Sequence, residues 1–167
     1  MKRNILLLTV LTSFTTLSGA EDFDKSKLSV GASYGFINNG VLSVRGDYDI
    51  SESAKAPVKI RVGYDRYSID TGAGVAGYSW GYNVYYGSAY YDFNKQLKVD
   101  AKVHPFLGLG LGFGTTSCTG WCNGVASPTV GGFFLMGGVQ YDLQKNINLE
   151  AGINGWSGLS LGGNYKF

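Results

Sequence analysis

The chain has 167 residues, a length that suits a single domain. Its 26 glycines are roughly twice the usual share, and 14% of its residues are aromatic while only 16% are charged. A mean hydropathy of -0.00 excludes a helical membrane protein, and a hydrophobic content of 44% excludes a disordered chain. This composition favours many short strands joined by turns, and therefore an all-β closed architecture.

The N-terminus has the three parts of a secretory signal peptide. Two basic residues precede an apolar run over residues 5–11, and residues 18–20 are small. This pattern predicts a cleaved signal peptide over residues 1–20, followed by a short periplasmic lead over residues 21–26. Two of the 14 basic residues belong to the signal, so its removal leaves 12 basic and 12 acidic residues. A mature chain without net charge is not expected to bind nucleic acid.

Residues 27–167 are predicted to form one barrel of eight strands. Apolar and polar residues alternate through eight segments, which is the pattern of strands with one apolar and one polar face. The expected strands are residues 27–36, 42–50, 58–65, 85–93, 98–114, 135–143, 147–154 and 159–167. The two longest loops, at about residues 68–79 and 117–129, fall at one end of the strands, and short turns fall at the other.

The two faces of these strands indicate which side of the barrel is outside. In a soluble barrel the apolar face is the core, whereas in a transmembrane barrel it faces lipid. A tilted strand of about ten residues is long enough to span a bilayer. Aromatic residues at both ends of the apolar face match the two membrane interfaces. The outer girdle is expected to contain Phe36, Tyr64, Tyr85, Phe113 and Phe133, and the inner girdle Tyr48, Tyr91, Phe93, Tyr141, Tyr165 and Phe167.

The polar face carries equal numbers of basic and acidic residues, which suits a charge network inside a narrow barrel. The interior of an eight-stranded barrel is just wide enough to be filled by side chains, and charges there must be paired. His104 is expected to belong to this polar plug; the competing interpretations are a catalytic base or a proton-sensitive gate. The predicted interior network consists of Arg45, Asp47, Lys59, Arg61, Asp65, Asp100, Lys102, His104 and Glu150.

The two cysteines, Cys118 and Cys122, stand close together in a loop rich in small residues. Because an exported chain leaves the reducing cytosol, the pair is predicted to form a disulfide. The disulfide would staple a surface loop that carries Trp121. That indole would contact a partner or the outer leaflet; the alternative is that the disulfide only makes the loop rigid.

Two local motifs resemble those of the small eight-stranded outer-membrane β-barrel proteins of bacteria, the OmpA/OmpX-like group. Residues 104–114 read His-Pro-Phe-Leu-Gly-Leu-Gly-Leu-Gly-Phe-Gly, similar to a strand common in such barrels. The terminal Tyr165-Lys166-Phe167 resembles the signal read by the barrel-assembly machinery. The resemblance implies an eight-stranded antiparallel up-and-down transmembrane β-barrel in the outer membrane, with outer-membrane lipid and the assembly machinery as partners.

The resemblance does not fix one activity, because members of the group serve as anchors, adhesins, small pores and occasionally enzymes. The sequence contains no catalytic constellation, and neither an enzyme activity nor a cofactor is expected. A structural or interaction role in the cell envelope, with an envelope protein partner, is the main hypothesis. A narrow pore through the polar interior is the alternative, and a soluble lipocalin-like carrier is a further one.

Overall fold

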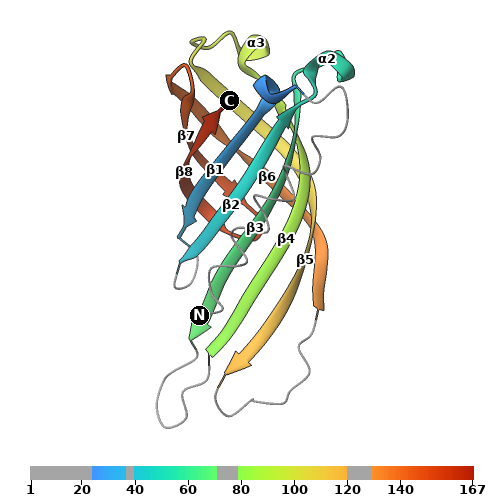
Figure 1. Cartoon of the computed structure of the whole chain (residues 1–167), viewed down its shortest axis with the longest axis vertical. Coiled ribbons are helices and arrows are strands. Elements are labelled where there is room, and N and C mark those ends of the chain that lie inside the picture. The colour runs from blue at the N-terminus through green and yellow to red at the C-terminus, as the bar shows by residue number, and fades with distance from the viewer. Residues whose placement is uncertain (1–23, 37–39, 71–78, 120–128) are drawn as a thin grey trace.

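The chain forms a closed β-barrel in which all eight neighbouring strand pairs are antiparallel (Figure 1). The computed structural model describes residues 24–36, 40–70, 79–119 and 129–167. The strands are β1 (Leu28–Gly35), β2 (Val41–Asp49), β3 (Val58–Asp70), β4 (Ser79–Asp92), β5 (Val103–Thr119), β6 (Thr129–Gln144), β7 (Ile147–Asn154) and β8 (Gly158–Lys166). The predicted eight-stranded all-β fold is confirmed. The predicted signal peptide lies outside the described residues.

The wall of the barrel is taller on one side. Strands β3 to β6 have 13 to 17 residues, whereas β1, β2, β7 and β8 have eight or nine. Figure 1 shows β3, β4 and β5 reaching farther than β1 and β2 at the end away from α2 and α3. Strand β5 continues through residues 115–119, whereas the sequence pattern places the start of the following loop at about residue 117.

The opposite end, which the sequence pattern assigns to the periplasm, carries the β2–β3, β4–β5 and β6–β7 connections, of which the second (residues 93–102) is longer than the short turn predicted there. This end holds a 3-10 turn, η2 (Lys25–Lys27), and two single-turn helices, α2 (Ser51–Ala54) and α3 (Asn94–Leu97). Both helices end at a lysine in the left-handed conformation, Lys55 with φ 51° and Lys98 with φ 50°. No helix in the described ranges has the length and apolarity needed to cross a bilayer.

The prediction that the fifth strand begins near residue 98 is wrong. The left-handed turn at Lys98 redirects the chain, and β5 begins only at Val103. Asp100 and Lys102 consequently lie in an exposed turn outside the barrel rather than in its interior network. The Asp100 carboxylate accepts the backbone N–H of Lys102 at 2.8 Å, which holds that turn locally.

The apolar side chains of the strands face outward. Leu107, Leu109 and Leu111 on β5 are more than half exposed, whereas Arg45 and Arg61 are buried. A continuous exposed apolar band over a charged interior inverts the arrangement of a soluble protein and matches a lipid-facing wall. Exposed aromatic residues stand toward the outer end (Phe36, Tyr85, Phe113 and Phe133) and the inner end (Tyr141, Tyr165 and Phe167) of this band.

The glycines of β5 make room for large rings inside the barrel. A Cβ at Gly110 would lie 2.4 Å from the ring of Phe134, and one at Gly112 would lie 2.6 Å from Nε1 of Trp156. The alternating glycines of β5 therefore leave space for aromatic side chains from β6 and from the connection between β7 and β8. The buried apolar cluster consists of Tyr86, Tyr90, Phe106, Phe134 and Met136, with Trp156 packed against it.

Candidate functional site: the filled interior

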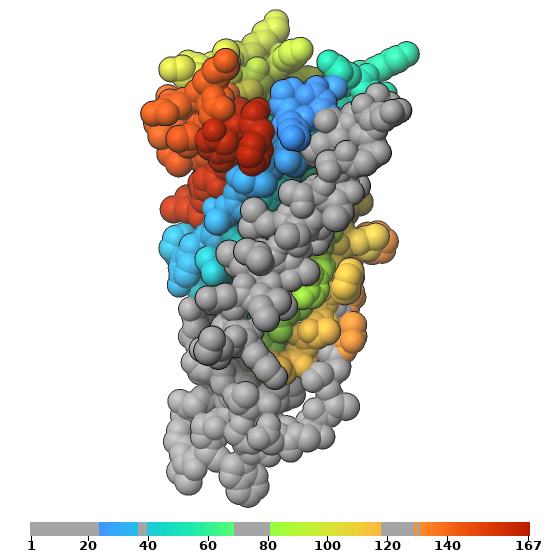
Figure 2. Space-filling view, in the orientation of Figure 1, coloured from blue at the N-terminus to red at the C-terminus, as the bar shows by residue number. Residues whose placement is uncertain are grey.

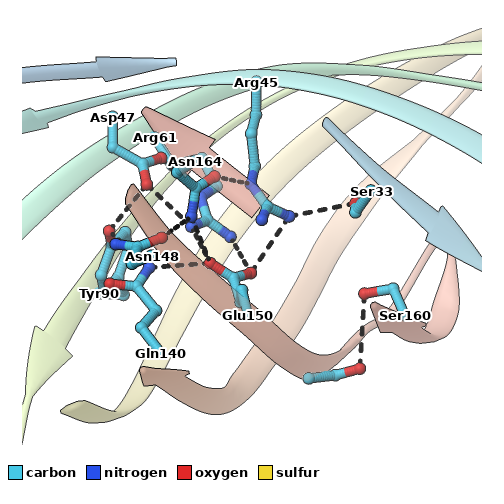
Figure 3. A network of polar contacts seen from close by, with 11 residues as sticks. Ser33, Arg45, Asp47, Arg61, Tyr90, Gln140, Asn148, Glu150, Ser160 and Asn164 are labelled. Carbon is cyan, nitrogen blue, oxygen red and sulfur yellow. Dashed lines mark hydrogen bonds and ion pairs between the residues drawn. The ribbon is translucent and has the colours of Figure 1, made fainter. Parts of the chain in front are cut away.

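Arg61 of β3 lies at the centre of the barrel interior and binds two carboxylates (Figure 3). It faces Asp47 of β2 directly across the strand pair, and donates to both Asp47 oxygens at 2.7 and 2.9 Å. From the other side Glu150 of β7 accepts from the same guanidinium at 2.9 and 2.7 Å. The planar fork of an arginine fits two carboxylates in this way and fixes their relative positions.

A second arginine, Arg45 of β2, completes the ion pairs. Its Nη1 lies 3.1 Å from Oε1 of Glu150, and its Nε donates to Oδ1 of Asn164 at 2.9 Å. The same Nη1 donates to the Ser33 hydroxyl at 3.1 Å. Two guanidinium groups and two carboxylates therefore neutralise one another in the lumen, as buried charges require.

Neutral side chains satisfy the remaining lone pairs of the carboxylates. The Tyr90 hydroxyl donates to Asp47 at 3.0 Å, and Nε2 of Gln140 donates to Glu150 at 2.8 Å. Asn164 also donates to Asn148 at 2.6 Å. Figure 3 shows these side chains converging from several strands on one level of the barrel. These residues are absent from the predicted network, although each stands at an inward position of its strand and the alternation places it there.

The aromatic cluster lies beside the charged network and fills much of the remaining interior. The Arg61 guanidinium lies 4.9 Å from the ring centroid of Tyr90 and 5.7 Å from that of Phe106, within the range of cation–π attraction. Trp156, in the connection between β7 and β8, packs edge-on against Phe134 at 6.4 Å. A small cavity bordered by Ser33, Ser43 and Arg45 has room for water but not for an organic solute.

His104 of β5 belongs to a separate cluster near the periplasmic end. Its Nδ1 lies 2.8 Å from Asp92, and its Nε2 lies 3.4 Å from Asp142. Asp142 also accepts from Lys166 at 2.7 Å. The imidazole thus bridges carboxylates from β4 and β6, on either side of its own strand. Within the described ranges no group of three or more metal-ligating side chains occurs.

The structure separates the predicted network into several parts. His104 belongs to its own cluster, and Asp100 and Lys102 are exposed in the turn after α3. Asp65 and Lys59 also lie away from the central ion pairs. Asp65 is fully buried opposite Ser43, and its carboxylate makes no direct ion pair with any described residue. Lys59 is half-buried and forms no ion pair within the described ranges. Arg45, Asp47, Arg61 and Glu150 are the predicted members that the structure brings into direct contact.

The remaining predicted residues belong to two parts of the chain: the end of β5 with the residues that follow it, and the C-terminus. Cys122, Trp121 and the side chain of Cys118 lie outside the described residues. Tyr165 and Phe167 are exposed and pack edge to face at 5.4 Å. The backbone N–H of Phe167 donates to the carbonyl of Leu28 at 3.1 Å, next to the seam where β8 closes the barrel on β1.

Comparison with solved structures identifies the architecture. Neisserial surface protein A (NspA) superimposes with a TM-score of 0.57 at 21% identity, over 84% of this chain and 94% of that one. The chain has the fold of the eight-stranded outer-membrane β-barrels. A major outer membrane protein of Thermus thermophilus matches with a TM-score of 0.56 at 14% identity, over 84% of this chain and 98% of that one. The N-terminal barrel domain of Pseudomonas aeruginosa OprF matches with a TM-score of 0.55 at 15% identity, over 84% and 96%.

These neighbours, together with the apolar exterior and charged interior, make the chain an integral outer-membrane β-barrel. No protein-family model matches the sequence, and no curated protein is significantly similar to it.

Proposed function

We propose that this barrel has a structural or interaction role in the cell envelope and is neither a pore nor an enzyme. The observation that carries the proposal is the filled lumen. Arg61 contacts Asp47 and Glu150 on both sides, and the aromatic cluster occupies the space beside it. An interior filled in this way suits a rigid support for the outer loops better than a path for solutes.

The outer loops are the surface that such a barrel would present to partners. We propose that Cys118, near the end of β5, forms a disulfide with Cys122 that staples the following loop, and that Trp121 provides the contact of this loop. Tyr165 at the end of β8 and Phe167 directly after it are exposed, which supports a role as the signal for the barrel-assembly machinery. An envelope protein is the partner class that fits a non-catalytic barrel with one stapled loop.

A narrow pore is the competing function, and conductance separates the two. The refolded protein is expected to remain electrically silent in a planar phospholipid bilayer, because opening a path requires several buried charge-assisted hydrogen bonds to break together. Heat-modified migration of the same sample in gels establishes that the barrel is folded. Steady openings of reproducible unit conductance from folded protein would contradict the structural role.

A further inference from the structure

The connection between β4 and β5 exposes apolar side chains outside the barrel wall. Leu97 and Val99 lie in or just after α3 at the periplasmic end and are 58% and 38% exposed. They precede Val103, the first residue of β5, so neither belongs to the lipid-facing side of a strand. They are also separate from the buried aromatic cluster in the lumen. Exposed apolar side chains beside a membrane-spanning wall are suited to contact the membrane itself.

Lysines surround these two apolar residues. The turn between β6 and β7 lies beside the α3 connection, since the backbone N–H of Asp142 donates to the carbonyl of Lys102 at 2.9 Å. The lysines of the two segments are exposed and form no ion pair with any described residue. Asp142 pairs with Lys166, and Asp100 is the one acid within residues 94–102, so positive charge exceeds negative charge on these two segments. This lysine patch consists of Lys95, Lys98, Lys102 and Lys145.

The α3 connection is held at the level of the inner aromatic girdle. The amide of Gln96 donates to the hydroxyl of Tyr91, a girdle residue at the end of β4. Asn94 closes the connection internally, because its amide donates to the carbonyls of Asp100 at 2.9 Å and Val103 at 2.5 Å. In Figure 2 the side chains of this connection project beyond the end of the barrel (yellow-green, top). These hydrogen bonds therefore hold residues 94–102 close to the membrane interface, where aromatic rings meet lipid headgroups.

We propose that residues 94–102, together with Lys145, form a binding surface for anionic phospholipid headgroups of the periplasmic leaflet. Leu97 and Val99 enter the interface, and the lysine patch contacts the phosphates around them. An apolar pair flanked by lysines that pair with no described acid has the character of an interfacial anchor, and the positive charge of these lysines complements anionic lipid. The proposal depends on the barrel spanning a membrane and is independent of the structural role proposed above.

The lipid preference of the folded barrel tests this surface. The protein is refolded into phosphatidylcholine vesicles that contain a trace of spin-labelled phosphatidylglycerol or spin-labelled phosphatidylcholine. Electron spin resonance then gives the ratio of the two association constants. The native barrel is expected to prefer phosphatidylglycerol by up to about fivefold at low salt, the contribution of one lysine near an anionic headgroup. Because the charges are exposed, this preference should fall as salt is added.

Two matched double variants locate the preference on the rim. Lys98→Gln with Lys102→Gln removes half of the lysine patch and is expected to bring the ratio toward one. Lys25→Gln with Lys55→Gln removes two exposed lysines from η2 and the end of α2, on other connections of the same rim, and should keep the native ratio. All four side chains are exposed, so both variants should fold. A native ratio of one, or an equal loss in the two variants, would overturn the proposal.

Discussion

Replacing Arg61 by methionine is expected to lower the free energy of unfolding by about 3–5 kcal/mol. Arg61 is 2% exposed and donates four hydrogen bonds to the carboxylates of Asp47 and Glu150. Without the guanidinium these two acids remain buried with Arg45 as the nearest positive charge, and an uncompensated buried charge is strongly destabilising. Urea titration of the refolded barrel in lipid vesicles, followed by tryptophan fluorescence, measures the loss.

The same strand offers a control for the loss of an arginine. Arg66 of β3 is exposed, and Arg66→Gln is expected to change the free energy of unfolding by less than about 0.5 kcal/mol. A further variant combines Arg61→Met with Asp47→Asn, which restores the charge balance of the network and leaves Glu150 paired with Arg45. It should recover part of the lost stability. Equal effects of Arg61→Met and Arg66→Gln would show that the central network does not stabilise the barrel.

Replacing Gly138 by alanine is expected to cost about 1–3 kcal/mol, although it adds a single methyl group. Gly138 of β6 pairs directly with Gly152 of β7. A Cβ at Gly138 would lie 2.3 Å from the carbonyl oxygen of Ala151 and 2.6 Å from Cα of Gly152. These are backbone atoms of a paired strand, so they cannot rotate away as a side chain could. The two strands must move apart, which weakens the hydrogen bonds of their ladder.

A glycine in open space provides the comparison. Nothing lies within 4 Å of a Cβ placed at Gly87 of β4. Gly87→Ala is therefore expected to be neutral, or to stabilise the barrel by up to about 1 kcal/mol by restricting the unfolded chain. Urea titration under the same conditions measures both variants. If Gly87→Ala destabilises the barrel as much as Gly138→Ala, the close approach of β6 and β7 is not the cause.

The sequence predicts the architecture because the alternation of apolar and polar residues depends only on the pleat of each strand. Leu107, Leu109 and Leu111 fall on one face wherever the strand lies, and the structure places that face outside. The ends of the strands are less predictable. Residues 98–102 continue the alternation, but the left-handed turn at Lys98 and the hydrogen bonds of Asn94 keep them out of β5.

The content of the interior depends on the stagger between strands, which the alternation of a single strand does not encode. Asp47 and Arg61 become partners through the register of β2 and β3, whereas Glu150 reaches Arg61 across the lumen. The same stagger puts Phe134 over Gly110 and fills the barrel with rings as well as charges. The polar face therefore predicts charged residues inside, but not which of them meet.

The orientation of the two faces is tested by the surroundings of a spin label on the apolar side of β5. The label replaces Leu109, which is 54% exposed, in a Cys118→Ser and Cys122→Ser background reconstituted in bilayers. The structure predicts strong relaxation by oxygen, which dissolves in lipid, and little by a water-soluble nickel chelate. A label at Ser53, which is exposed in α2 beyond the end of the wall, should show the reverse. A label at Leu109 that is immobile and shielded from both reagents would mean that the apolar face is a core, and would contradict the transmembrane barrel.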